Sequence, residues 1–276
     1  MELRDLQLKE LDILKECLKI FQKYNLRYFM LGGTFLGAVR HRGFIPWDDD
    51  IDIGMPREDY EQFCEIAKKE LIKPFFCSTF RVEKSHNGYC CRVVNTNVLV
   101  HRDDAIIHKT ENLWIDIFPL DGMPDSNILC FFHKMNLLFK RLLLQYSKFE
   151  NGINMKKKRK IVEAVLIKIG YIVSRVFRFD VKKRLFAIDK LLRRYKYDTS
   201  NYVVNFMGAY KFKEMFPRYL YENIAEYQFE DLMLPAPKDY DAILSQMYGD
   251  YMNPPPQNQR FSHSIQFAET EAVGND

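Results

Sequence analysis

Hydrophobic and polar positions recur with two different periods along the chain, and together they predict an α/β fold. Apolar residues at helical spacing, from Leu6 to Phe21, predict a helix over residues 5–24. A short apolar run at 26–31 and an alternating run at 50–55 predict strands. Further strands are predicted at 75–82, 90–100, 113–122, 201–206 and within 217–231, and further helices at 56–71 and 238–252.

The segment between the first two strands contains signals for a turn and a short helix. Gly32 and Gly33 follow the first strand directly, and Thr34 is a suitable N-cap for a helix that ends near Gly43. Pro56, followed by acids early and lysines late, opens the next helix. The economical interpretation is an α/β body with a helical elaboration.

Composition places the chain among ordinary globular proteins. Hydrophobic residues make up 47% and charged residues 28% of its 276 residues, which argues against disorder. No run of eighteen apolar residues lacks a charge, so we expect no transmembrane helix, and the amphipathic first 24 residues do not resemble a secretory signal. Six cysteines without a CxxC pair favour free thiols and a cytoplasmic location.

Charge is distributed unevenly along the chain. Residues 131–196 hold 19 Lys and Arg against 4 Asp and Glu, a net charge of +15, so a total of +4 leaves −11 for the rest. This segment is interpreted as a helical bundle packed on the body, as amphipathic helices on an anionic membrane, or as a nucleic-acid site. The acidic remainder argues against an extended nucleic-acid surface, and we expect no nucleic-acid partner.

The stretch FMLGGTFLGAVRHRGFIPWDDDIDIGM places Asp48, Asp49, Asp50 and Asp52 at the start of a predicted strand. A solvated acidic loop is the plain interpretation. Strand alternation, however, would put the carboxylates of Asp50 and Asp52 side by side, with Asp48 in the same direction and Asp49 opposite. Such crowding is relieved by a hard divalent cation, for which Mg²⁺ with carboxylate and phosphate ligands is the first choice and Mn²⁺ the second.

The Gly32-Gly33 turn complements this acidic cluster. A turn that opens a helix presents backbone N–H groups and a positive dipole end to a phosphate, and Arg40 and His41 follow nearby. The two halves together predict a metal-dependent site for a nucleotide or a phosphate ester.

A Gly-Gly pair at a helix start followed by D-h-D-h on a strand resembles the signature of the nucleotidyltransferase superfamily that includes DNA polymerase beta. More narrowly, GGTFLGAVRHRGFIPWDDDIDIGM resembles the opening motif of the LicD family of phosphocholine transferases, which is related to fukutin and the fukutin-related protein. The resemblance extends to LWIDIFPLDG and to MYGDYMNPPPQNQRFSH, and it is weakest in the basic helical region.

This resemblance implies a nucleotidyltransferase-like α/β (α+β) fold, with a mixed sheet flanked by helices and a basic helical insertion. The implied division is a catalytic core at 1–126, the insertion at 127–197 and a C-terminal part at 198–276 that completes the core and substrate site. In the superfamily a third carboxylate from a neighbouring strand completes the metal site, and Asp116 is the matching position. Asp50, Asp52 and Asp116 are therefore the expected catalytic residues and metal ligands, with Asp116 also the base for the acceptor hydroxyl.

The resemblance also implies where substrates bind. Aromatic side chains suit a quaternary ammonium, and Trp47, Trp114, Tyr28 and Tyr248 are candidates, whereas Asp121 is interpreted as a turn residue before Gly122. The expected substrate- and phosphate-binding residues are Gly32, Gly33, Thr34, Arg40, His41, Trp47, Asp48, Trp114, Tyr248, Arg260 and His263.

The implied reaction is transfer of phosphocholine from CDP-choline to a sugar hydroxyl of a lipid-linked glycan, expected to be a teichoic acid precursor, with release of CMP. It would take place at the cytoplasmic face of a bacterial membrane, to whose anionic surface the enzyme binds peripherally. Transfer of a nucleotidyl group, or of another CDP-activated alcohol phosphate such as ribitol phosphate, is the enzymatic alternative. An inactive peripheral membrane scaffold is the alternative outside catalysis. The sequence leaves the acceptor sugar, the number of metals and the oligomeric state open.

Overall fold

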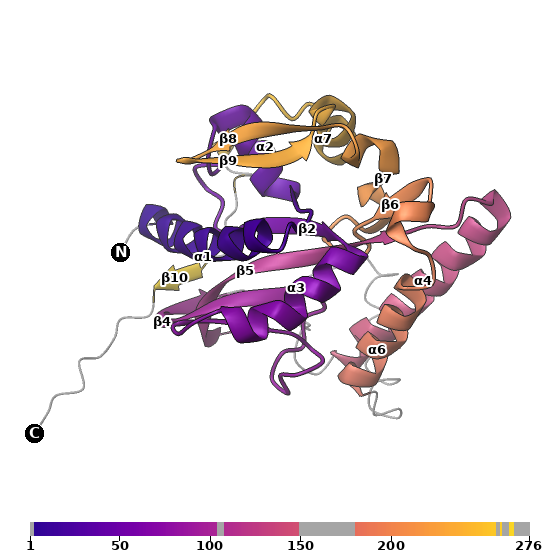
Figure 1. Ribbon diagram of the computed structural model, residues 1–276, viewed down its shortest axis with the longest axis horizontal. Coiled ribbons are helices and arrows are strands. Elements are labelled where there is room, and N and C mark those ends of the chain that lie inside the picture. Colours follow the sequence, from indigo (N-terminus) through magenta and orange to yellow (C-terminus); the bar gives the residue numbers. More distant parts are fainter. Residues whose placement is uncertain (1–2, 104–107, 149–179, 258–259, 261–264, 268–276) are drawn as a thin grey trace, which may run out of the picture.

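The computed structural model describes residues 3–103, 108–148, 180–257, 260 and 265–267. It contains a curled mixed sheet flanked by helices, which confirms the expected fold class (Figure 1). Within the described residues the sheet has eight strands with the central order β1-β2-β5-β4-β10, and β8 and β9 form a separate hairpin. His263 and the middle of the predicted helical insertion lie outside the described residues.

The helices follow the predicted order. They are α1 (Leu3–Lys23), α2 (Gly32–His41), α3 (Arg57–Glu70), α4 (Asn127–Ser147), α6 (Val181–Leu192) and α7 (Tyr240–Tyr248), with short 3-10 turns η2 (Tyr197–Thr199), η3 (Lys211–Glu214) and η4 (Arg218–Tyr221). The strands are β1 (Phe29–Met30), β2 (Asp52–Pro56), β3 (Phe75–Ser78), β4 (Cys91–Asp103), β5 (His108–Gly122), β6 (Tyr202–Val204), β7 (Met215–Pro217), β8 (Ile224–Phe229), β9 (Leu232–Pro237) and β10 (Ile265–Phe267).

Two local predictions were wrong in a way that matters for the site. Helix α2 begins at Gly32 with Leu31 as its N-cap, and not at Thr34, the predicted cap. The Thr34 hydroxyl instead accepts a hydrogen bond of 2.8 Å from the Asp52 backbone N–H and so ties α2 to the start of β2. Strand β2 begins at Asp52, so Asp50 precedes the strand and its direction is not set by strand alternation.

Strand pairing brings the two acidic positions together. Strand β2 runs parallel to β5 with Asp52 opposite Asp116, and the Asp116 N–H donates to the Ile51 carbonyl at 3.0 Å. The neighbouring residues Ile115 and Ile117 are 1% and 0% exposed in the main hydrophobic core, as predicted from their parity. Burial of these alternate side chains fixes the register, because a shift by one residue would exchange the core and site faces.

Helices α1 and α3 pack against β5 and against each other, and so cover the central strands. Cys17 and Phe21 of α1 and Phe63 of α3 are almost fully buried between them, with the Phe21 and Phe63 rings 5.1 Å apart. Helix α2 packs between β2 and β8. The site therefore rests on a rigid sheet and a rigid helix rather than on loops alone.

A buried ion network joins α3, β5 and α6. Arg57 donates two hydrogen bonds to Asp121, from Nε at 2.7 Å and from Nη2 at 2.6 Å, and its Nη1 lies 3.3 Å from an oxygen of Asp189. All three side chains are buried. The interpretation of Asp121 as a turn residue was wrong: this carboxylate anchors Arg57 inside the protein.

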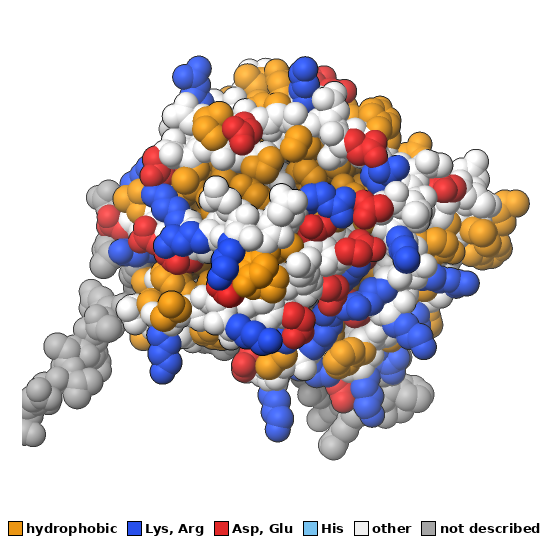
Figure 2. All heavy atoms as spheres, viewed as in Figure 1, with side chains coloured by type: hydrophobic (Ala, Val, Ile, Leu, Met, Phe, Trp, Pro, Cys, Tyr) orange, Lys and Arg blue, Asp and Glu red, His pale blue; other side chains and the backbone are white. Residues whose placement is uncertain are grey.

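Helices α4 and α6 pack side by side and project from the sheet (Figure 1). Apolar side chains gather at the end of the molecule where α4 projects (Figure 2). Leu137 and Leu144 are buried with Leu185 and Ile188 of α6 in a second core. None of the helices in the described part of the chain is long and apolar enough to cross a bilayer.

Candidate active site

The Gly32-Gly33 turn lies against the start of β2. Strand β1 is antiparallel to β2, so its end meets the beginning of β2, and the Leu31 N–H donates to the Asp52 carbonyl at 3.0 Å. Gly32 has a φ of +49°, and a Cβ placed on it would lie 3.2 Å from Oδ2 of Asp52. Glycine is favoured here on both grounds, because L-residues with side chains rarely adopt this φ and a carboxylate needs the space.

Asp48 approaches the first turn of α2 even more closely. A Cβ on Gly33 would lie 2.4 Å from Oδ2 of Asp48, closer than real Cβ contacts. The absent side chain lets this carboxylate lie over the helix N-terminus, where the macrodipole favours negative charge. The two glycines thus set the positions of two carboxylates, which the motif alone does not reveal.

We expect Gly33→Ala to lower catalytic activity by roughly 10²-fold, because displacement of a site group by about 1 Å costs this much. Steady-state rates with a saturating donor measure the effect. In an Asp48→Ala background the same glycine substitution should cost little more, because the displaced group is then missing. Full additivity of the two losses would show that Gly33 does not act through Asp48.

Asp116 is held by polar contacts on the neighbouring strands. Its Oδ1 accepts a hydrogen bond from Arg92 Nε at 3.2 Å and lies 3.1 Å from the Cys90 thiol. The Arg92 guanidinium lies 4.1 Å from the centre of the Trp114 ring, so the ring supports the arginine that orients Asp116.

Negative charge is concentrated around these residues. Removal from solvent raises the pKa of Asp52 well above its ordinary value, and the nearby charges of Asp50 and Asp116 raise it further. Glu10 of α1 is 1% exposed, and burial together with Asp50 and Asp49 raises its pKa well above the ordinary value. Its buried Oε2 has no hydrogen-bond partner. A divalent cation would relieve this repulsion, so the carboxylate oxygens present fit a hard metal ion.

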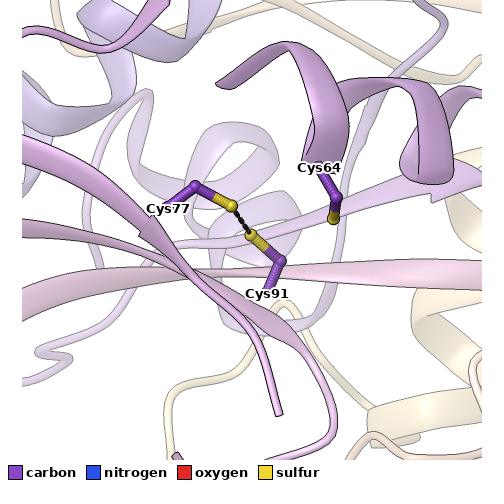
Figure 3. A group of neighbouring side chains, drawn as sticks. All are labelled: Cys64, Cys77 and Cys91. Atoms are coloured by element: carbon purple, nitrogen blue, oxygen red, sulfur yellow. Dashed lines mark hydrogen bonds between the residues drawn. The ribbon is translucent and has the colours of Figure 1, made fainter. Parts of the chain in front are cut away.

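Across the part of the chain that the structure describes, the aspartate carboxylates do not form a group of three potential ligand atoms that all lie within 4.8 Å of one another. Among the described residues, the group of three potential ligand atoms within 4.8 Å of one another is formed by the thiols of Cys64, Cys77 and Cys91 (Figure 3). These thiols lie in or beside the hydrophobic core between α3, β3 and β4. Cys77 and Cys91 sulfurs are 3.1 Å apart, and all six cysteines are free thiols.

A cavity of about 540 Å³ opens beside the acidic cluster, a volume typical of sites for small ligands. One wall comes from the opening motif and the other from residues after 204. The predicted residues that line it are Gly32, Gly33, Arg40, Trp47, Asp48, Asp50, Asp52 and Tyr248. Asp49 is fully buried and is not among the lining residues.

Arginines gather around Trp47 at this cavity. The Arg260 guanidinium lies 4.4 Å and that of Arg40 5.9 Å from the centre of the Trp47 ring, and the His41 ring meets the same indole edge-on. Arg40 Nη1 also donates to the Tyr251 carbonyl at 2.5 Å. The first and last motifs of the sequence therefore meet in space, with two cations available for an anionic ligand.

Six other described candidates lie outside the cavity lining: Asp116, His41 and Arg260, whose contacts are given above, and three that support the site from behind. Trp114 is 9% exposed and stacks with Arg92, and Tyr28 packs against Phe21 at the edge of the core. Thr34 is 3% exposed and binds the Asp52 backbone. For these residues the structure indicates a supporting position rather than a lining one.

Sequence reasoning predicted Tyr248 but missed the part of the second wall that residues 205–214 build. Glu214 accepts hydrogen bonds from the Asn205 side chain at 2.7 Å and from the Tyr210 N–H at 2.9 Å, and burial raises its pKa to about 7. The Tyr210 ring meets Tyr248 edge-on at 5.6 Å between centres. No periodic pattern marks this segment.

Glu10 was also missed, although an acid on the apolar face of α1, four residues from both Leu6 and Leu14, was a usable signal.

Comparison with known proteins gives a consistent set of relatives. Residues 25–150 match the family model described as LicD/FKTN/FKRP, nucleotidyltransferase domain. The lipopolysaccharide cholinephosphotransferase LicD of Haemophilus influenzae is 27% identical over 274 residues, which are 97% of this chain and 98% of that protein. An uncharacterized protein of Rickettsia typhi is 45% identical over 118 residues, 42% of this chain and 35% of its own. The human ribitol 5-phosphate transferase FKRP is 45% identical over 40 residues, 14% of this chain and 8% of its own.

Proposed function

Since residues 25–150 form a domain of the LicD/FKTN/FKRP nucleotidyltransferase family, we propose that the protein transfers phosphocholine from CDP-choline to a sugar hydroxyl of a cell-surface glycan and releases CMP. The observation that carries this proposal is the cavity itself, which combines an acidic cluster, a glycine turn at a helix N-terminus and an aromatic wall. The relative that matches nearly the whole chain is a cholinephosphotransferase by name, and this similarity supports choline over other alcohols.

In this proposal Asp50, Asp52 and Asp116 hold a Mg²⁺ or Mn²⁺ ion. When bound, the ion would neutralise the charge that develops on the phosphoryl oxygens of the donor. The residues of this chain would orient the donor: the first turn of α2 offers N–H groups to a phosphate, Arg40 lines the cavity, and Arg260 lies over the ring of the lining residue Trp47. Asp116, oriented by Arg92, is the proposed base for the acceptor hydroxyl.

The wall formed by Tyr210, Glu214 and Tyr248 is the proposed place of the choline headgroup. Aromatic faces attract a quaternary ammonium, and a carboxylate in a site with little water adds charge attraction. Glu214 is buried and lines the cavity, and its two hydrogen bonds fix the direction of its carboxylate. Gly208 leaves room for it, since a Cβ there would lie 2.4 Å from Oε1 of Glu214.

We expect Glu214→Gln to weaken CDP-choline binding at least tenfold at pH 8, above the Glu214 pKa of about 7, because the substitution there removes a charge near the cation. Tyr210→Leu should weaken it roughly tenfold through loss of the ring face. Binding of CDP, which lacks the cation, should change little in both variants. Dissociation constants for the two ligands, with thermal unfolding as a check of the fold, measure these effects. Equal losses for CDP-choline and CDP would assign these residues to the nucleotide instead.

The acceptor is the least defined part of the proposal. A lipid-linked glycan at the inner face of the cell membrane fits transfer from a cytoplasmic donor. The relative named above acts on lipopolysaccharide by name, whereas a teichoic acid precursor was the expectation from sequence, and both offer sugar hydroxyls.

Product analysis tests the reaction type. The protein incubated with CDP-choline, Mg²⁺ and glycan acceptor should release CMP in step with phosphocholine incorporation into the glycan. Pyrophosphate released from a nucleoside triphosphate would support nucleotidyl transfer instead. Preference for CDP-ribitol would make the protein a ribitol phosphate transferase, as FKRP is by name.

A further inference from the structure

Helix α4 has two apolar faces, and only one of them packs against the part of the protein that the structure describes. The packed face includes Leu137 and Leu144, which are almost fully buried. On the other side Phe131, Phe132 and Phe139 are 60%, 64% and 58% exposed. The outward face consists of Ile128, Phe131, Phe132, Met135, Leu138, Phe139 and Leu142, all of them exposed.

These seven residues form one continuous stripe. At about 100° per residue they fall within an arc of roughly 120°, and the buried leucines lie on the opposite side of the helix. A helix that is apolar all round is ordinarily buried in protein or in lipid. Figure 2 shows these apolar side chains gathered at the end of the molecule where α4 projects, with basic side chains of neighbouring segments beside them.

We propose that the outward face of α4 is a docking surface for an anionic lipid membrane, with the helix lying in the interface and not crossing it. The charge of the surrounding surface selects this occupant. Residues 127–148 contain no Asp or Glu, and of their four Lys and Arg, Arg141 and Lys148 donate to carbonyls of the protein, which leaves Lys134 and Lys140. Lys183 and Lys190 of α6 are exposed as well. Cations beside an inserted apolar stripe bind anionic headgroups. Pairing of two copies through this face would bring like charges together.

The inward side of α4 connects this surface to the cavity. Arg141 donates hydrogen bonds to the carbonyls of Phe206 and Gly208, the latter at 3.1 Å, and so holds the segment that carries Tyr210 and Glu214. Docking through α4 would therefore place the cavity near the membrane surface. The lipid interaction is inferred from α4 and the cations beside it. That the location brings the enzyme close to a lipid-linked acceptor rests on the proposed function.

Flotation with lipid vesicles tests the surface directly. The full chain should bind vesicles that contain phosphatidylglycerol, and binding should fall with added salt and be weak on pure phosphatidylcholine. The double variant Phe132→Ser/Phe139→Ser should bind at least tenfold less, whereas Ile72→Ser/Phe76→Ser, which changes exposed apolar residues elsewhere, should bind normally.

A failure of the docking surface can be told apart from a failure of the proposed function, because vesicle binding and CMP release are measured separately. CMP release with a water-soluble glycan acceptor should be the same in the α4 double variant and in the unmodified chain. If no variant releases CMP, the proposed function fails and vesicle binding still decides the surface. Unchanged binding by the α4 double variant, or no binding by the unmodified chain, would overturn the docking surface. A concentration-dependent dimer that the double variant abolishes, without vesicle binding, would assign the face to a second copy.

Discussion

Asp52→Asn is expected to lower phosphocholine transfer by roughly 10³-fold and at the same time to raise the melting temperature in metal-free buffer. The loss of activity follows from removal of a proposed metal ligand. The gain in stability follows from the surroundings of Asp52, because its pKa is raised by loss of solvent and by the charges of Asp50 and Asp116. A neutral amide of the same shape relieves that repulsion. Transfer rates and thermal unfolding of the same preparation measure both effects.

Asp12→Asn is the matched control, since it makes the same chemical change at an exposed position on α1. It should leave both the rate and the melting temperature within error. Added Mg²⁺ should raise the melting temperature of the unmodified chain more than that of Asp52→Asn. Turnover by Asp52→Asn at the normal rate would remove Asp52 from the metal site.

Arg57→Met is expected to lower the free energy of unfolding by about 3–5 kcal/mol, the effect of breaking a buried ion pair from one side. Methionine keeps much of the length of the side chain but leaves the Asp121 carboxylate, which is 1% exposed, without its two arginine hydrogen bonds. Asp189 keeps Arg81 and Arg193 as partners, so the loss is concentrated at Asp121. Denaturant unfolding followed by fluorescence and circular dichroism measures it.

Lys15→Met serves as the control because Lys15 pairs with Asp231 at the exposed surface. Exposed pairs contribute about 0–1 kcal/mol, so this variant should unfold near the midpoint of the unmodified chain. Equal small losses in both variants would mean that the Arg57 network is solvated and does not hold α3 and α6 to the sheet.

Most of the acidic half of the site could be predicted because its determinants are local: Gly32, Gly33 and Asp48 to Asp52 lie in one short stretch. The prediction of Asp116 as their neighbour came from the family resemblance, and residue alternation gave only the burial of Ile115 and Ile117 on the opposite face. Alternation also gave Asp50 a direction, yet Asp50 precedes β2 and reaches the cavity from a loop. The family resemblance, now matched over residues 25–150, added the link between segments far apart in sequence.

The part of the opposite wall formed by residues 205–214 could not be predicted, because long-range packing places it. Glu214 lies in a short 3-10 turn without a periodic signal, and its segment is held by Arg141 of α4. Trp114 is a predicted substrate-binding residue that does not line the cavity. It lies on the same face of β5 as Asp116, but the Arg92 guanidinium covers its ring. Residue alternation predicts the face of a strand and does not predict such a covering contact.

The central claim is that one cavity binds CDP-choline through a divalent metal held by the aspartates. Calorimetric titration of the protein with CDP-choline, in Mg²⁺ and in EDTA, tests it most directly because it measures donor and metal together. We expect one site per chain in Mg²⁺, with affinity at least tenfold weaker in EDTA and in Asp52→Asn. The same affinity with and without Mg²⁺, or no binding in Mg²⁺, would contradict the account.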